Sequence, residues 1–290
     1  MNLKILLTGS AGFTGRFFMT QAQAAGHAVH AFAADLTNKE AVAAEVAQVQ
    51  PDAVVHLAAI SFVGHADDAA FYGVNVVGTT NLLGALATLP NRPRRVLLAS
   101  SANIYGNCAT SPISETQAPA PINHYAMSKL AMEHMASTFG ERLPIVITRP
   151  FNYTGPGQAL NFVIPKLVSH YARRARMVEL GNVEVEREFN DVRLVCDAYL
   201  ALLTRGQPGE VFNVCSGQPY TLQTVMDTLT DLTGHTVQAR INPAFVRANE
   251  VKRLCGDPGK LHALCQQAGV ELTQPSLRDM LAWMLAKADT

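Results

Sequence analysis

The sequence predicts an α/β protein with a doubly wound parallel sheet, and two patterns carry this prediction. Apolar, β-rich runs recur at 3–8, 27–32, 52–59, 95–100, 144–150 and 210–215. They are continuously apolar rather than alternating, as expected of strands buried on both faces of a parallel sheet. Alanine- and leucine-rich stretches of helical character lie between them, at 39–49, 73–88 and 125–139. Strands that alternate with helices in this way are typical of doubly wound sheets.

The alternation breaks after Pro150, and the rest of the chain predicts a smaller lobe. The passage that follows Pro150 is rich in proline and glycine, which indicates a loop. Helical patterns then appear at 160–175, 221–234 and 276–288. We therefore predict a larger domain that consists of 1–160 plus about 187–215. The smaller C-terminal, substrate-binding lobe is predicted to consist of 161–186 plus 216–290.

The composition excludes several classes of function. Of the 290 residues 48% are hydrophobic, and 23 lysines and arginines balance 23 aspartates and glutamates. Such a chain lacks the broad positive field that nucleic-acid binding needs. The five cysteines are scattered without C-x-x-C spacing, which favours reduced thiols over disulfides or metal ligands. No signal sequence or membrane-spanning run is recognisable, so we expect a cytoplasmic protein that binds no membrane.

A glycine-rich segment, TGSAGFTG at 8–15, follows the first apolar run directly and precedes a helical pattern. Glycines at these positions let the backbone turn tightly and approach a pyrophosphate, whose charge a helix N-terminus favours. The spacing is G-x-x-G-x-x-G rather than the usual G-x-G-x-x-G. Its place between a strand and a helix nevertheless predicts a dinucleotide site on a Rossmann sheet.

An acidic residue about 20 positions after such a loop can hold a ribose hydroxyl, and Asp35 stands at this distance from Gly15. The second strand is expected to end just before Asp35, so we predict a contact to the adenine or the ribose. Because Arg16 lies in the glycine segment's helix, the sequence leaves both NADP and NAD open as the cofactor.

Tyr125 and Lys129 are spaced i, i+4 in a predicted helix, which places both on one face. An unperturbed tyrosine, with a pKa near 10, is a poor proton shuttle at neutral pH. We expect the neighbouring ammonium to lower this pKa toward the working range. Ser101, at the end of a predicted buried strand, is the third candidate catalytic residue.

The motifs together resemble the extended short-chain dehydrogenase/reductase superfamily, which acts mostly on nucleotide-sugars. The resemblance rests on TGSAGFTG, HLAA (56–59), NVVGTTNLL (75–83), SSANIYG (100–106), YAMSK (125–129), RPFNYTGPGQ (149–158) and REFNDV (187–192). It implies that Ser101 binds the sugar carbonyl, that Tyr125 passes the proton and that Lys129 holds the nicotinamide ribose. It also implies cofactor contacts from Gly9, Gly12, Phe13, Thr14, Gly15, Asp35, Leu36, Leu57, Ala58, Ala59, Asn75, Ser100, Tyr125 and Lys129.

Sugar dehydratases of that superfamily carry a carboxylate just after the catalytic serine or threonine. Ala102 and Asn103 stand at these positions here. An amide cannot remove the proton beside the ketone, so dehydration is not expected. Reduction of a ketosugar, or 4-epimerisation through a transient ketone, needs only hydride transfer and one proton.

The second half of the chain resembles the GDP-4-keto-6-deoxy-D-mannose reductases, which make GDP-D-rhamnose. This resemblance implies a reduced NADP or NAD as hydride donor, a GDP-sugar substrate and a homodimer. It also implies substrate contacts from Asn103, Asn152, Phe162, Val163, Lys166, Arg187, Arg247 and Glu250. Phe245 and Ala248 depart from the pattern, since these reductases often have arginine and proline there.

Two alternatives to the reductase stay open from the sequence. A UDP- or GDP-hexose 4-epimerase with tightly bound NAD needs the same serine, tyrosine and lysine. A non-catalytic protein that senses the dinucleotide needs the glycine segment but no proton donor. Neither reading requires a metal, and His27 and His30 would lie on opposite faces of a strand, which disfavours a shared metal ion.

Overall fold

A computed structural model describes residues 2–64, 66–246, 251–272 and 274–288. Its centre is a six-stranded sheet in the order β10-β5-β4-β3-β1-β2, with every neighbouring pair parallel. The strands are β1 (Lys4–Thr8), β2 (Ala28–Ala31), β3 (Ala53–His56), β4 (Arg95–Ala99), β5 (Ile145–Pro150) and β10 (Val211–Val214). The predicted α/β fold class is confirmed.

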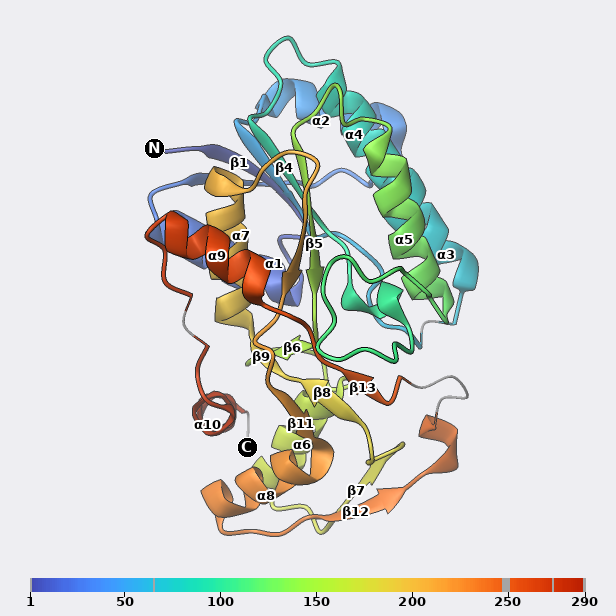
Figure 1. Cartoon of the computed structure of the whole chain (residues 1–290), viewed down its shortest axis with the longest axis vertical. Helices are drawn as coiled ribbons and strands as arrows, with labels where there is room; N and C mark the ends of the chain where they lie inside the picture. The colour runs from blue at the N-terminus through green and yellow to red at the C-terminus, as the bar shows by residue number, and fades with distance from the viewer. Residues whose placement is uncertain (1, 65, 247–250, 273, 289–290) are drawn as a thin grey trace.

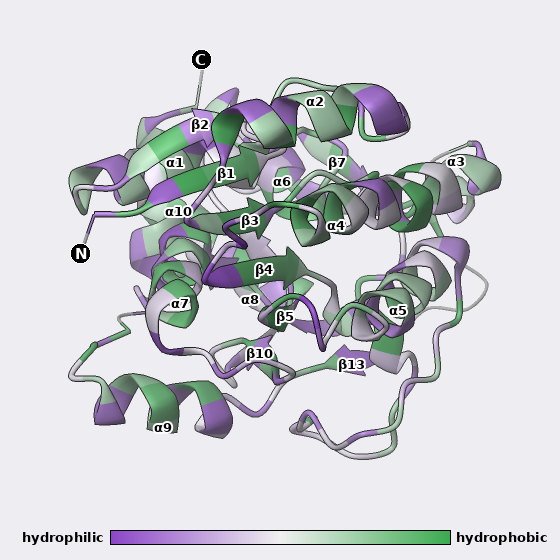
Figure 2. Ribbon diagram, turned by 90° about the horizontal axis from the view of Figure 1, so that it is seen from above, coloured by the Kyte–Doolittle hydropathy of each residue, from purple (hydrophilic) through white to green (hydrophobic). Residues whose placement is uncertain are grey.

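Helices cover both faces of this sheet (Figure 2). One layer holds α1 (Phe13–Ala24), α7 (Val192–Arg205) and α9 (Gly259–Gln267). The other holds α2 (Lys39–Val49), α4 (Thr79–Ala87) and α5 (His124–Ser137). In β1, Ile5 and Leu7 pack toward the first layer and Leu6 toward the second. This use of both strand faces explains why the strands read as continuous apolar runs.

A smaller lobe lies below the sheet in Figure 1. It contains α6 (Val163–Ala172), β7 (Met177–Leu180), α8 (Leu222–Thr233), β12 (Gln238–Ile241), the short helix η3 (Pro243–Phe245) and α10 (Leu277–Ala286). α6, α8 and α10 bury their apolar faces in a separate core around Leu167, Leu229 and Met280. The three helices predicted after Pro150 are therefore present, each starting and ending within a few residues of its predicted bounds.

Short strands join the two parts. β8 (Glu186–Glu188) pairs with β11 (Pro219–Thr221) and β13 (Arg253–Leu254), and β6 (Tyr153–Thr154) pairs with β9 (Asn190–Asp191). β10 is a strand of the large sheet, and α7 packs against that sheet. α9 differs from the predicted division, because its apolar residues Leu261 and Cys265 are buried in the core beneath the large sheet.

The connection from β3 to α4 runs through α3 (Asp68–Tyr72) and a π-helical turn, η1 (Gly73–Gly78). The predicted helix 73–88 thus begins as a π-helix before it continues as α4. In the described ranges, no helix has both the length and the apolar character to cross a bilayer.

Candidate active site

The candidate site lies where the parallel strands β1, β3, β4 and β5 end. Since their carboxyl ends meet at one edge of the sheet, the segments that follow Thr8, His56, Ala99 and Pro150 come together there. Ligands of doubly wound sheets bind in the crevice outside these strand ends. The smaller lobe stands opposite this edge (Figure 1).

The glycine segment forms a tight turn between β1 and α1. Gly9 has a φ of 70°, and a Cβ there would stand 2.7 Å from the amide nitrogen of Ala58. A Cβ on Gly15 would stand 2.7 Å from the Cα of Ser10 and press against the carbonyl oxygen of Gly9. Only glycine fits both positions, so the loop can lie close to the turn after β3.

The residues at this edge fit a dinucleotide. Helix α1 starts at Phe13 with Gly12 as its N-cap, and neither a side-chain cap nor an acidic residue occupies its first turn. Its first amide groups therefore point, unbonded, to where a pyrophosphate would sit. The buried hydroxyl of Ser100 has no hydrogen-bond partner among the described residues, which leaves it free for a cofactor.

Asp35 and Leu36 follow the second strand as predicted. The side chain of Asp35 is exposed and accepts hydrogen bonds from the amide and hydroxyl of Thr37, which lower its pKa. Leu36 is buried against Gly78. Arg16, by contrast, points to the loop after β6, where its guanidinium donates to the carbonyl of Gly157 at 3.0 Å.

Ser101, Tyr125 and Lys129 converge at the end of β4. All three side chains are buried, and those of Tyr125 and Ser101 are hydrogen-bonded to each other. Lys129 Nζ donates to the carbonyl of Ala99, the last residue of β4, at 2.7 Å. The helical spacing of the tyrosine and the lysine and the strand that delivers the serine thus produce the predicted trio.

The pKa of Tyr125 differs in direction from the sequence prediction. Burial raises it, the hydrogen bond with Ser101 lowers it less, and the pKa stands above its ordinary value. Burial also lowers the pKa of Lys129 to about 8, although Glu133 opposes this. Desolvation therefore outweighs charge effects, and Tyr125 is a neutral phenol at neutral pH.

Two buried networks that sequence reasoning missed support this trio. In the first, Arg149 of β5 forms a bidentate ion pair with Glu133, one turn beyond Lys129 on α5, at 2.7 and 3.1 Å. Arg149 also donates to the hydroxyl of Tyr105 in the turn η2 (Ala102–Tyr105) after Ser101. The i, i+4 spacing of Lys129 and Glu133 could have indicated that Glu133 lies on the same helix face as Lys129. Nothing in the sequence identifies Arg149, which is distant along the chain, as the partner of Glu133.

The second network runs through His56. Thr8 Oγ1 lies 2.7 Å from His56 Nδ1, and His56 Nε2 lies 2.8 Å from Thr79 Oγ1. The hydroxyl of Thr79 donates to the carbonyl of Asn75, and the amide of Asn75 donates to Ser128 Oγ beside Tyr125. Asn75 also accepts from the amide of Ile60 at 3.0 Å, so it fixes the turn of Leu57, Ala58 and Ala59.

On the substrate side, Asn103 lies next to Ser101, and its side-chain amide donates to Ser101 Oγ at 3.1 Å. Asn152 is exposed beyond β5. Neither position 102 nor position 103 offers a carboxylate. Asp191 is buried as the N-cap of α7 and accepts from Arg193.

The smaller lobe presents the other predicted substrate residues. Phe162 is the N-cap of α6 and Val163 its first residue. Lys166, one turn later, donates to the carbonyl of Glu179 and lies 4.5 Å from the ring centre of Phe245. Arg187 donates to the carbonyls of Val251 and Lys252. Arg247 and Glu250 lie outside the described residues.

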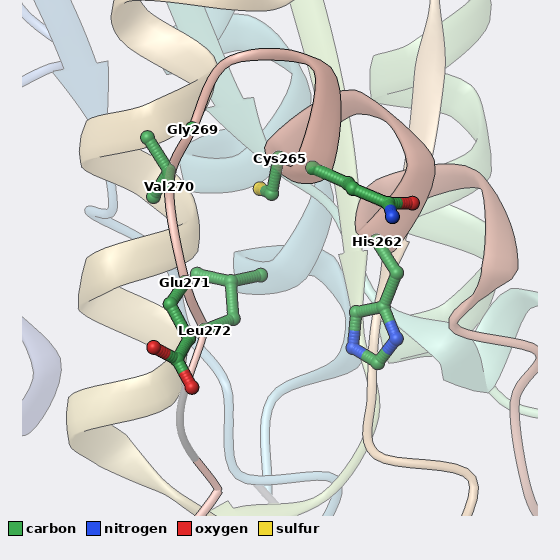
Figure 3. A pocket seen from close by; sticks show the side chains of 7 residues that line it. His262, Cys265, Gly269, Val270, Glu271 and Leu272 are labelled. Carbon is green, nitrogen blue, oxygen red and sulfur yellow. The ribbon is translucent and has the colours of Figure 1, made fainter.

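Other features stand apart from this site. A hollow of about 380 Å³ lies beside α9, lined by His262, Cys265 and Glu271 among others (Figure 3). It is in the α7–α9 layer, on the face of the sheet opposite α5. Within the described ranges, no cluster of histidine, cysteine and acidic side chains suits a metal ion.

Comparison with known proteins gives the family. The sequence profile of the GDP-mannose 4,6 dehydratase family matches residues 21–266. A "GDP-6-deoxy-D-talose 4-dehydrogenase" of Aggregatibacter actinomycetemcomitans is 36% identical, over 89% of this chain and 90% of that protein. A "GDP-6-deoxy-D-mannose reductase" of Pseudomonas aeruginosa is 35% identical, over 90% of each chain.

Solved structures are similar along nearly the whole chain. A Burkholderia cenocepacia J2315 protein to which epimerase activity is ascribed is 46% identical, with a TM-score of 0.90 over 98% of this chain and 97% of that one. A Pseudomonas aeruginosa protein in complex with NADPH is 32% identical, with a TM-score of 0.89 over 99% and 97%. The chain thus belongs to the GDP-mannose 4,6-dehydratase family, within the extended short-chain dehydrogenases/reductases, and is an oxidoreductase of the NAD(P)-dependent kind.

Proposed function

We propose that this protein reduces the C4 ketone of a nucleotide-linked 4-keto-6-deoxyhexose, with GDP-4-keto-6-deoxy-D-mannose as substrate and GDP-D-rhamnose as product. The observation that carries the proposal is the buried trio of Ser101, Tyr125 and Lys129 with no carboxylate at positions 102 and 103. This set can move one proton at a carbonyl oxygen but has no base there for dehydration. The names of the two relatives, a reductase and a dehydrogenase of GDP-sugars, agree with it.

A bound reduced nicotinamide supplies the hydride. In the proposed reaction Tyr125 donates its phenolic proton to the oxygen at C4, and its raised pKa keeps that proton in place at neutral pH. Ser101 holds the same oxygen and is itself oriented by Asn103. Lys129, fixed by the carbonyl of Ala99, provides a cation beside the ribose and the phenol.

The nucleotide would lie against the smaller lobe. Asn152 follows β5, and Phe162 and Val163 stand at the start of α6, while Lys166 and Arg187 carry the positive charge that would meet the diphosphate. Guanidinium and ammonium groups suit a diphosphate. Arg187 now binds the carbonyls of Val251 and Lys252, so we expect it to hold that segment in place when a nucleotide binds.

The test is a spectrophotometric assay in which GDP-4-keto-6-deoxy-D-mannose is generated in place by its dehydratase. Oxidation of NADH or NADPH that depends on the ketosugar supports the reductase. Cofactor binding without oxidation, with GDP-, UDP- and dTDP-linked ketosugars alike, contradicts it and favours a dinucleotide-sensing protein.

A second candidate product differs from GDP-D-rhamnose in its configuration at C4. Hydride delivered to the other face of the ketone gives GDP-6-deoxy-D-talose, and the relative from Aggregatibacter actinomycetemcomitans carries that sugar in its name. Proton NMR of the product distinguishes the two sugars by their coupling constants at C4.

A 4-epimerase is the remaining enzymatic candidate, because epimerase activity is ascribed to the Burkholderia cenocepacia protein. An epimerase would retain NAD through purification and consume no reduced cofactor during turnover. Conversion of UDP- or GDP-hexoses to their 4-epimers under these conditions would favour it.

We also propose a homodimer in the cytoplasm. Val77 and Met127 are 52% and 43% exposed, and they lie on η1 and α5, which pack against each other. Light scattering after gel filtration measures the mass, and substitution of Met127 by glutamate is expected to shift a dimer toward monomers.

A further inference from the structure

A carboxylate occupies the end of β2, where the chain leaves the sheet. Glu45 of α2 accepts hydrogen bonds from the backbone amides of Ala33, at 2.9 and 3.2 Å, and Ala34, at 2.7 Å. His30, the third residue of β2, lies 3.0 Å from the same carboxylate through Nε2. One acidic side chain therefore uses both amide donors at this strand end.

The position matters because of what binds there in a doubly wound sheet. β2 is the neighbour of β1, and the glycine turn after β1 receives the pyrophosphate. The end of the second strand then faces the adenosine ribose, whose 2' oxygen is a hydroxyl in NAD and a phosphate ester in NADP. Free amides or cations there favour the phosphate, whereas a carboxylate repels it.

The nearby cations do not offset Glu45. Arg16, the residue that kept NADP open in the sequence, is bonded to the carbonyl of Gly157 and lines a hollow with Trp283 and Lys287. From 32 to 45, all of which the structure describes, the single lysine or arginine is Lys39, an exposed residue at the start of α2. Asp35 adds a second, exposed negative charge to the same segment.

We infer that Glu45 is a specificity-determining residue that makes this enzyme prefer NAD(H) over NADP(H), an inference that rests on the dinucleotide site described above. The carboxylate satisfies the two amides that a 2'-phosphate would need, and its charge opposes the phosphate. The chain would then differ from the relative whose structure contains NADPH.

The protonation of Glu45 agrees with this role. Burial raises its pKa, but the hydrogen bonds from Ala33, Ala34 and His30 together lower the pKa below its ordinary value. The group is thus ionised at every pH at which the enzyme would work. Its side chain is 16% exposed, so water reaches it and screens part of the repulsion.

The inference is tested by titrating the protein with NADH and with NADPH and following nucleotide fluorescence, without any sugar present. For the unaltered protein we expect NADH to bind about tenfold more tightly, the size of the repulsion between a carboxylate and a phosphate dianion at nearly water-like screening. Glu45→Ala is expected to tighten NADPH binding and to bring the ratio of the two dissociation constants, for NADPH and for NADH, near one. Glu45→Gln, which keeps the size of the side chain, should shift the ratio in the same direction.

Glu40→Ala is the matched control, because it removes a negative charge from the same helix but has no bond to the end of β2. If it shifts the ratio as much as Glu45→Ala does, the effect is one of net charge and the inference is wrong. Equal or tighter binding of NADPH by the unaltered protein also overturns it. Binding that follows the expected pattern without turnover of any ketosugar would contradict the proposed reductase and leave this inference intact.

Discussion

At the scale of single residues, Tyr125 determines the proposed chemistry, and its surroundings suit a proton donor. The phenol is buried beside Ser101, and desolvation raises its pKa rather than lowering it. A reduction consumes one proton at the ketone oxygen, so a tyrosine that stays protonated at neutral pH is the form the reaction requires. The reverse reaction needs a phenolate and should be faster at higher pH.

Replacing Tyr125 with phenylalanine tests this role. General acid catalysis by a positioned side chain typically contributes about 10² to 10⁴ in rate, so we expect kcat to fall by about that factor. NADH binding, measured by fluorescence, should remain near that of the unaltered protein. Tyr72→Phe is the control, since this tyrosine is bonded to His124 at the surface. Unchanged turnover by Tyr125→Phe would exclude it as the donor.

His56 is a second residue whose protonation has a consequence. Burial, with a smaller effect of the Lys129 charge, lowers its pKa to about 3 from an ordinary value of 6.5. Because Thr79 donates to Asn75, its oxygen accepts from His56 Nε2, and Nδ1 accepts from Thr8. The imidazole is thus neutral, with its proton on Nε2.

This neutral histidine predicts acid sensitivity. The unfolded chain binds a proton at His56 below pH 6.5 and the folded protein does not, so the stability this group supports is present above pH 6.5. It is lost as pH falls toward 3, at up to about 1.4 kcal/mol per pH unit. Urea denaturation at pH 7.5, 6.0 and 5.0 measures the free energy of unfolding. Between these pH values it should decline less for His56→Asn than for the unaltered protein. Imidazole NMR signals that show a charged His56 at pH 5.5 in the folded protein would contradict this prediction.

At the scale of elements, the ion pair between Glu133 and Arg149 holds α5 against β5 and the turn after Ser101. The side chains are 7% and 8% exposed, and Arg149 also bonds to Tyr105, whose hydroxyl donates to Asn213 of β10. Helix α5 carries Tyr125 and Lys129, so this pair fixes the donor helix relative to the strand that delivers the serine.

Removing one member of this pair leaves a buried charge without its partner. Glu133→Gln is therefore expected to destabilise the protein by about 3–5 kcal/mol. The double variant Glu133→Leu with Arg149→Met should regain part of that loss, because it buries no charge. Urea denaturation measures the free energy of unfolding of the single and the double variant. A single variant as stable as the unaltered protein, or a double variant no better than the single one, would show that the pair contributes little.

At the scale of the whole molecule, the sequence predicts the sheet and the trio of candidate catalytic residues because both depend on local patterns. Apolar runs identify β1 and β4, and the spacing of Tyr125 and Lys129 requires only one helix. Arg149 and His56, which are buried, and Glu45, which is partly exposed, reach their positions through contacts between distant segments, which no spacing reveals. The predicted direction of the Tyr125 pKa shift was wrong because burial, which the sequence does not specify, raises this pKa more than the hydrogen bond with Ser101 lowers it.

Two phenylalanine rings form a contact between the larger domain and the smaller lobe. Phe62, in the segment after β3, and Phe162, the N-cap of α6, pack edge to face with ring centres 6.0 Å apart. The contact joins the segment after β3, on the side of the proposed cofactor site, to the start of α6, where we propose that the nucleotide binds. Phe162→Ala should raise KM for the nucleotide-sugar several-fold and leave the Kd for NADH unchanged. Leu160→Ala, at a 58% exposed position in the same loop, is the control. In a double-mutant cycle Phe62 and Phe162 should show a coupling of about 0.5–1.5 kcal/mol in kcat/KM. Additive effects would mean that the two rings act separately and that another contact orients the smaller lobe.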